Sequence, residues 1–279
     1  MSARDESKCF LWVPNPNKKP VQLAEGTTVI DVSSKGHRPF SYFSPFSHNA
    51  KYAIPIPGDE ARRADSVEGI WQGLKIIDGV TDDSLFKGRA VKRRGKQPSH
   101  RFEGKEIGYI DARRKVYQPA FIYHAVNNAL PLAWSALEEE LRNGAVALQD
   151  VEVNGEINDP SSSYAHSSLL VELLNVLDAS PLPMVIPATP DDVQQHEGFS
   201  NLQDQVDALV EYRGSLKPRS KEVLDDVITF AYLFAPNTSQ EELKQVFALR
   251  TMKKADIVSS RLDKYQPTDA TRQAYNDLQ

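Results

Sequence analysis

The sequence predicts a mainly helical α+β protein in two parts, residues 1–180 and a helical extension at residues 181–279. Three observations support this prediction. Short β-branched runs bounded by prolines come first, amphipathic stretches with helical spacing follow, and a proline-rich segment at 181–190 precedes the extension. A chain of 279 residues is long enough for one or two domains with a buried core.

The strands are expected near the N-terminus. Residues 8–13 and 27–32 are short apolar or β-branched runs, with prolines between them that break regular structure. Residues 51–57 predict a third strand, which Pro55, Pro57 and Gly58 end.

In the middle of the chain, apolar residues recur with the spacing of helices. Asp65 or Ser66 is a good N-cap for a helix over residues 66–79, in which Glu68 follows Asp65 as in a capping box. Residues 129–142 and 167–177 predict two further helices, and residues 145–153 alternate as a strand does. Residues 105–126 fit neither pattern cleanly.

In the extension, the spacing of apolar residues predicts three or four helices, at residues 220–234, 239–250 and beyond. Their amphipathic faces suit packing against a core or a partner. The sequence leaves open which of these roles they have.

The composition of the chain argues against several classes of function. The net charge of −5 argues against broad, sequence-independent binding to nucleic acid. The one cysteine, Cys9, fits a reducing compartment, which favours a cytoplasmic protein, and no Cys or His cluster has the spacing of a metal site. No apolar run approaches the ~20 residues of a membrane span. We therefore expect no metal, no cofactor and no membrane.

Glu68 is the first candidate for chemistry. On a helix it shares a face with Gln72 and Lys75, and Trp71 lies beside it. Burial near an aromatic ring raises the pKa of a carboxyl group, as general acid or base catalysis requires. The alternative is that Glu68 only caps its helix or pairs with Lys75.

A basic segment at residues 87–101 is the second candidate. It carries seven Lys or Arg and no acid until Glu103, in an otherwise acidic chain. Glycines allow close backbone approach and guanidinium groups suit phosphate oxygens, so the segment is typical of a phosphate site. A solvated loop is the alternative. Asp159, in a turn-forming Asn-Asp-Pro sequence, is a third candidate, and the aromatic cluster that includes Phe43 either stacks on a base or belongs to the core.

These segments, in this order, resemble the NADAR family, whose bacterial members include the YbiA-like proteins. Residues 40–46, Phe-Ser-Tyr-Phe-Ser-Pro-Phe, are similar to the family's opening segment. A family helix of the type Ser-x-Glu-x-x-aromatic-Gln-x-x-Lys is matched by Ser66, Glu68, Trp71, Gln72 and Lys75. Residues 90–96 are similar to its Gly-Arg basic segment, and residues 158–159 and 169–173 to its late acidic turn and following helix. The resemblance spans roughly residues 38–178.

The resemblance implies an N-glycosidase that acts on an ADP-ribose-like or phosphoribosyl N-glycoside, such as ADP-ribosylated guanine. By this resemblance the partner is a nucleotide-like small molecule or ADP-ribosylated nucleic acid. Glu68 would be the catalytic carboxylate and Asp159 the second acid, with Phe43 and Trp71 flanking the base. The remaining binding residues would be Gln72, Lys75, Arg93, Arg94 and Lys96.

Two alternatives remain. Gly69 stands where the family commonly has a histidine, and Pro160 replaces part of its late motif, which favours an inactive nucleotide-binding module. A structural or interaction protein, with the helical extension docking a partner, is the other.

Overall fold

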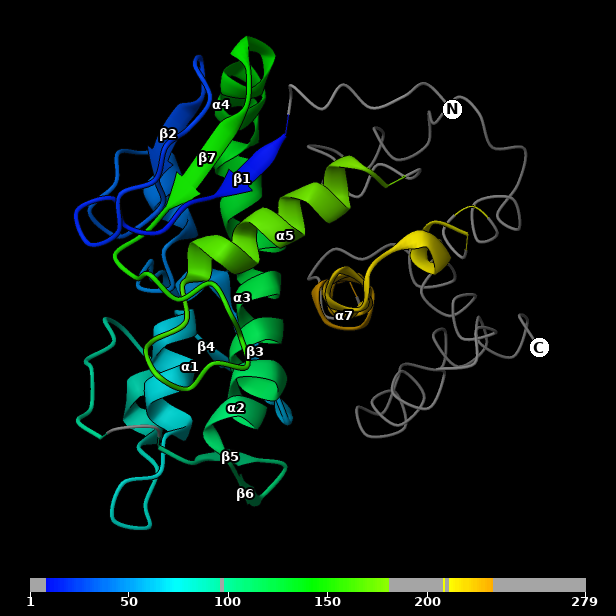
Figure 1. The fold of residues 1–279 in the computed structure, drawn as a ribbon. Coiled ribbons are helices and arrows are strands. Elements are labelled where there is room, and N and C mark those ends of the chain that lie inside the picture. The colour runs from blue at the N-terminus through cyan, green and yellow to red at the C-terminus, as the bar shows by residue number, and fades with distance from the viewer. Residues whose placement is uncertain (1–8, 96–97, 181–207, 209–210, 233–279) are drawn as a thin grey trace. The chain divides into compact units, whose positions relative to one another are not determined.

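The computed structural model describes residues 9–95, 98–180, 208 and 211–232. The chain divides into two units, Met1–Asn175 and Val176–Gln279. The described residues contain both helices and strands, as predicted, and helix predominates (Figure 1). None of the helices in these ranges has the length and apolar character needed to cross a membrane.

A three-stranded parallel sheet lies at one end of the first unit (Figure 1). Its order is β1 (Phe10–Trp12), β7 (Val146–Gln149), β2 (Thr28–Asp31), and Val146 is in register with both Phe10 and Thr28. The three strand predictions behind this sheet are confirmed. Because the strands are parallel, the segments that follow β2 and β7 leave from the same edge of the sheet.

Two small hairpins complete the strands. β3 (Ile54–Ile56) pairs with β4 (Asp59–Ala64), and β5 (His100–Phe102) pairs with β6 (Lys105–Ile107). The strand predicted at residues 51–57 is therefore confirmed in part as β3, whose three residues are all buried; residues 50–52 form the short helix η2 (Ala50–Tyr52), and Pro55 lies within the strand and does not end it.

One helical run from residue 109 to residue 143 forms the centre of the unit. It joins α2 (Tyr109–Ala112), η4 (Arg113–Tyr117), α3 (Gln118–His124), η5 (Ala125–Ala129) and α4 (Leu130–Asn143). The π turns η4 and η5 end just before Pro119 and Pro131. A proline lacks an N–H and its ring clashes with the carbonyl four residues earlier, so a wider turn accommodates it without ending the helix. The ambiguous residues 105–126 are thus mostly helical, and every residue of α3 is buried.

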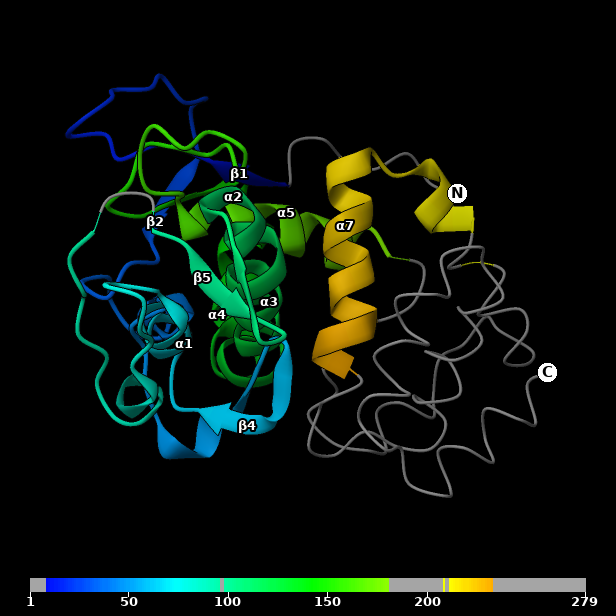
Figure 2. The ribbon, with the colours of Figure 1, turned by 90° about the horizontal axis from the view of Figure 1, so that it is seen from below.

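Helix α1 (Val67–Leu74) packs beside α3 (Figure 2). It ends at residue 74, and the prediction that it runs to Gly79 is wrong. Lys75 turns to an extended conformation and forms an antiparallel bridge with His100, and the Ile76 N–H donates to the Ser99 carbonyl oxygen, so the backbone pairs with this segment instead of continuing the helix. Gly69 and Gly73 let η3 (Asp83–Phe86) approach α1 closely, since a Cβ at Gly69 would lie 2.5 Å from the Leu85 carbonyl oxygen.

Further described helices are η1 (Phe40–Phe43), α5 (His166–Asp178) and α7 (Pro218–Asp226), the last continuing into η7 (Val227–Tyr232). Helix α5 confirms the helix predicted at 167–177, and α7 with η7 confirms most of the one at 220–234. The linker predicted at 181–190 and the helices predicted from residue 239 onward lie outside the described residues.

Candidate functional site

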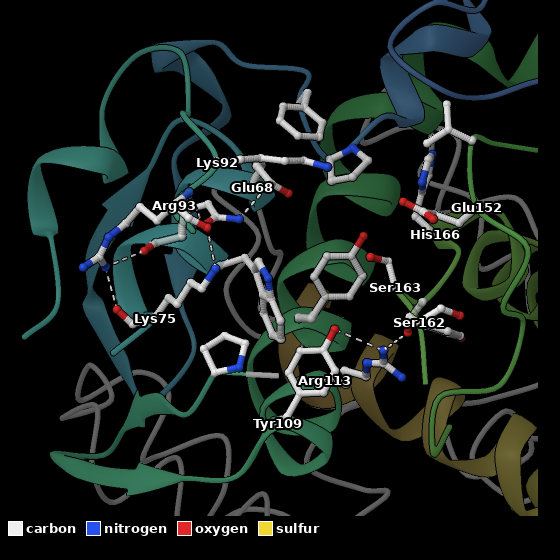
Figure 3. A pocket seen from close by; sticks show the side chains of 18 of the residues that line it. Glu68, Lys75, Lys92, Arg93, Tyr109, Arg113, Glu152, Ser162, Ser163 and His166 are labelled. Atoms are coloured by element: carbon white, nitrogen blue, oxygen red, sulfur yellow. Dashed lines mark hydrogen bonds between the residues drawn. The ribbon is translucent and has the colours of Figure 1, made fainter. Parts of the chain in front are cut away.

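A cavity of about 540 Å³ lies in the first unit, with walls formed by segments far apart in the sequence. Ser33 and Ser34 follow β2, and Val151 and Glu152 follow β7, so two walls come from one edge of the parallel sheet. Ligands commonly bind outside the carboxyl ends of parallel strands. Its charged lining residues are Glu68, Lys75, Lys92, Arg93, Arg113, Glu152 and His166 (Figure 3).

Glu68 reaches this cavity from the first turn of α1. Ser66 is the N-cap, and its hydroxyl oxygen accepts a hydrogen bond from the Gly69 N–H at 3.0 Å. The Glu68 side chain therefore does not cap the helix, and it forms no ion pair with Lys75, whose Nζ donates instead to the Arg93 carbonyl oxygen at 2.6 Å. The structural alternatives for Glu68 are thus wrong, and its carboxyl group is left facing the cavity.

Burial controls the charge of this carboxyl group. Glu68 is only 5% exposed, and desolvation raises its pKa, although the Gln72 hydrogen bond and the nearby charges of Lys92 and Lys75 oppose the rise. A carboxyl group with a raised pKa is a stronger base when ionised and retains its proton to a higher pH. Glu68 thus has the electrostatic setting expected of a general base.

A short relay orients Glu68. The Arg93 N–H donates to Gln72 Oε1 at 2.9 Å, which turns Gln72 Nε2 toward Glu68 Oε1 at 2.8 Å. Among the described residues Glu68 Oε2 has no hydrogen-bond partner, and it is not sealed from the open space of the cavity. One carboxylate oxygen is therefore held in place, and the other is available to a ligand or a water molecule.

The basic segment contributes to the wall in a different way from the one predicted. The guanidinium of Arg93 binds the carbonyl oxygens of Gln72 and Lys75, at 3.1 and 2.6 Å, and so caps the end of α1. Arg94 is exposed and is not part of the wall, and Lys96 lies outside the described residues. Lys92, which the sequence did not single out, faces the cavity with its Nζ 5.3 Å from the centre of the Phe46 ring.

Aromatic rings form much of the remaining surface. Trp71 lines the cavity and contacts Tyr109 and Tyr117, with centroid distances of 5.9 and 5.6 Å. Phe43 is 0% exposed and belongs to the core, so its predicted role beside the base is not supported, and Phe46 occupies the wall in its place.

Tyr117 contributes a neutral donor to this surface. Burial first, and then the nearby charge of Glu68, raise the pKa of Tyr117 well above its ordinary value. Its phenol therefore stays protonated, and its hydroxyl has no hydrogen-bond partner among the residues that the structure describes.

Asp159 does not join Glu68. Its carboxylate accepts hydrogen bonds from the Ser161 N–H and hydroxyl, both at 2.8 Å, so it stabilises a turn, and the cavity is lined by the residues after it. The second acid in the wall is Glu152, which follows β7 (Figure 3). The sequence suggested Asp159 because of its turn context, whereas the position of Glu152 depends on which strands are neighbours.

A buried ion pair was also missed. His166 Nδ1 lies 2.8 Å from Asp150 Oδ2, and His166 Nε2 lies 3.0 Å from the Val32 carbonyl oxygen. Both ring nitrogens thus face acceptors, which requires an imidazolium with two protons. Burial alone would lower the pKa of His166, but the charge and hydrogen bond of Asp150 raise it. The spacing of Asp150 and His166 in the sequence is not that of metal ligands. The sequence signal for this pair is that Asp150 directly follows the strand β7 and His166 begins the helix α5.

No group of three or more His, Cys, Asp or Glu in the described ranges is arranged to hold a metal ion. The geometry instead offers one carboxylate with a free oxygen, a protonated phenol, two lysines, a buried arginine and a fixed imidazolium around one space.

The searches of curated proteins and of solved structures found no match. A family model, described as a family of unknown function, DUF6939, matches residues 17–170. The matched range contains the lining residues of the cavity, from Ser33 to His166, and it covers more than half of the chain. The chain therefore belongs to the DUF6939 family.

Proposed function

We propose that this protein is an N-glycosidase that hydrolyses the bond between a ribose and a base in an ADP-ribose-like or phosphoribosyl substrate. The observation that carries the proposal is Glu68, a buried carboxyl group with a raised pKa and one free oxygen in a cavity lined by rings and cations. An NADAR-like relationship and a cytoplasmic location are parts of the same proposal.

The chemistry requires a carboxylate at this point. As the bond from the sugar C1′ to the base nitrogen breaks, its electron pair leaves with the nitrogen and positive charge develops on the sugar ring. The Glu68 carboxylate stabilises that charge and accepts a proton from the water whose oxygen attacks C1′. The departing nitrogen takes up a proton, so the products are the free base and a sugar with a hydroxyl at C1′.

The walls suit the rest of such a substrate. Trp71 presents an aromatic face on which a base can stack, and Lys75 and Lys92 place positive charge beside Glu68. Burial, and the nearby charge of Arg93, lower the pKa of Lys75, while Glu68 partly opposes this effect. An anionic ligand would therefore favour the charged form of Lys75.

The direct test is to incubate the protein with ADP-ribosylated guanine, NAD and riboflavin-pathway precursors and to measure the released base by chromatography. We expect release from at least one substrate and its loss in Glu68→Gln, which keeps the acceptor for Gln72. Glu156→Gln is the matched control, because Glu156 is an exposed acid outside the cavity. No release from any substrate, or equal release by Glu68→Gln, would contradict the proposal.

An inactive binding module is the second candidate. It is favoured by Gly69, where the Leu85 carbonyl oxygen leaves no room for a side chain, so the histidine of the resembling family has no equivalent here. Binding of a nucleotide by the wild-type protein without release of base would support this candidate.

A further inference from the structure

The turn that follows Asp159 forms one wall of the cavity, and two carbonyl groups, those of Asp159 and Ser162, are bound by two side chains. Arg113 donates to the carbonyl oxygens of Asp159 and Ser162, at 2.6 and 2.5 Å. The Asn154 side-chain amide donates to the same two oxygens, at 3.0 and 3.1 Å. These two carbonyl oxygens are therefore satisfied from within the protein.

The donors of Ser161 bind the Asp159 carboxylate, but those of Ser162 and Ser163 are not satisfied by any described residue. In a trans peptide unit the N–H points opposite to the carbonyl, so the N–H of Ser163 points away from Arg113 and Asn154. Neither the N–H nor the hydroxyl groups of Ser162 and Ser163 have a partner among the described residues, and both serines line the cavity. Four free donors thus occur on two neighbouring residues.

The charges of this wall are mixed, because His166 is paired with Asp150 and Glu152 is an acid, whereas Arg113 has no ionic partner among the described residues. Arg113 is 2% exposed, and its four bonded N–H groups go to uncharged oxygens, those of Ile157, Asp159, Ser162 and Tyr109. His166 lies on the same side of the cavity as Ser162 and Ser163 (Figure 3), with both nitrogens already bound. Glu152 is the acid of this wall. Arg113 cannot readily donate to a ligand, but its charge is not balanced by an ion pair, and its field favours a negative group beside the free donors, while Glu152 opposes it.

We propose that the Ser162–Ser163 turn is an oxyanion site that binds a phosphate group. Two backbone N–H groups and two hydroxyls match the several terminal oxygens of a phosphate, and successive free N–H groups are a common way to bind anions. The wall opposite, with Glu68 and Lys92, is then free for the sugar and the base (Figure 3). As the phosphate end of a glycoside substrate, the site rests on the proposed function, and it takes the place of the phosphate contact expected from Arg94, which is not part of the wall.

The test is calorimetric titration of the full chain with inorganic pyrophosphate and, separately, with ADP-ribose. Ser163→Asp places a carboxylate among the free donors, and we expect it to weaken binding of both probes by about tenfold or more, as like charges at a binding site do. Because Ser163 is exposed, the variant is expected to fold, which circular dichroism checks.

Asn158→Asp is the matched control. It adds the same charge to the same loop, but Asn158 is exposed, lies outside the cavity wall and faces Arg114, with 2.9 Å between its Oδ1 and the guanidinium Nη2. We expect its affinity to stay within about twofold of the wild type, since its pairing with Arg114 is a surface contact.

Two results would overturn the site: no binding of pyrophosphate and ADP-ribose by the wild-type protein, or equal weakening by Ser163→Asp and Asn158→Asp. The proposed function fails separately. Phosphate binding that depends on Ser163 without any release of base would keep the oxyanion site and reject hydrolysis. Undiminished release of base and an unchanged KM in Ser163→Asp would reject the site and keep hydrolysis.

Discussion

Two buried acids of the first unit, Glu68 and Asp150, have pKa values that are shifted in opposite directions. Asp150 accepts hydrogen bonds from the Glu152 and Ser167 N–H groups, at 2.7 and 2.9 Å, and pairs with His166. Burial alone would raise its pKa, but these partners lower it to about 2. Glu68 has one hydrogen bond from a neutral amide, so burial prevails and its pKa rises.

The difference teaches that burial alone does not mark a reactive acid. A carboxylate with three partners is stabilised in its ionised form and holds structure together. A carboxylate that is desolvated but left with a free oxygen is destabilised, and a fold retains such a group where function requires it. The predictions below test this contrast, beginning with the largest expected effect.

Asp150→Asn should destabilise the first unit most. It leaves the buried imidazolium of His166 without its counter-charge, and removing one partner of a buried ion pair typically lowers the free energy of unfolding by about 3–5 kcal/mol. Urea unfolding followed by circular dichroism measures the loss.

The pH dependence of stability sharpens this prediction. Asp150, with its folded pKa lowered to about 2, contributes stability above its ordinary pKa that is lost as the pH falls toward 2. The folded pKa of His166 is raised, so its contribution is full below 6.5 and is lost as the pH rises through the raised value. A wild-type stability that changes with pH no differently from that of the Asp150→Asn/His166→Gln double variant would contradict the ion pair.

Glu68→Gln should have the opposite effect on stability and a large effect on activity. Because the folded pKa of Glu68 is raised, the group lowers stability increasingly as the pH rises above its ordinary pKa, and fully above the raised value, and the neutral amide escapes this cost. We expect a higher Tm than the wild type at pH 8, no difference near pH 4, and a fall in kcat of about 10²–10⁴-fold. A lower Tm at pH 8 would show that Glu68 is a structural acid like Asp150.

Lys92→Gln and Arg94→Gln compare a cation of the cavity wall with one outside it. We expect the Lys92 variant to lose about tenfold in kcat/KM, as removal of one charge-assisted contact does, and the Arg94 variant to lose less than about twofold. Steady-state kinetics on the best substrate from the screen provides both values. Equal losses of kcat/KM in the two variants would show that the basic segment as a whole, and not Lys92 in particular, contributes the contacts to phosphate.

Gln72→Met should shift the pH profile more than it lowers the maximal rate. Losing the amide that binds Glu68 Oε1 removes the hydrogen bond that opposes the raised pKa of Glu68. The acidic limb of kcat/KM should therefore move to higher pH, with a loss of only about several-fold at the plateau. An unmoved limb would show that Gln72 does not tune Glu68.

Local patterns in the sequence predicted much of the fold. The strands at residues 10–12 and 28–31 and the helices at 130–143 and 166–178 follow from periodicity and breakers that act within one segment. The end of α1 was not predictable in this way, because the backbone of Lys75 is taken by His100, 25 residues later.

The candidate site shows the same limit. Glu68, Trp71, Gln72 and Lys75 share one short stretch, and all four line the cavity. Glu152, Arg113 and His166 reach it only through the pairing of β7 with β2 and the packing of the central helical run, which no local pattern encodes. Asp159 and Phe43 are chemically suitable for the site, but the Asp159 carboxylate stabilises a turn and the Phe43 ring is buried in the core.

The middle position of β7 has a consequence for biosynthesis. Phe10 and Thr28 both pair with Val146, so neither can form its sheet hydrogen bonds before β7 is synthesised. More than a hundred residues separate Thr28 from Val146 in the chain. Such distant pairing is slow, and it leaves β1 and β2 of the nascent chain unpaired until β7 has been made. The two walls that follow β2 and β7 form only when this sheet closes, so the cavity should be among the last features of the first unit to be completed.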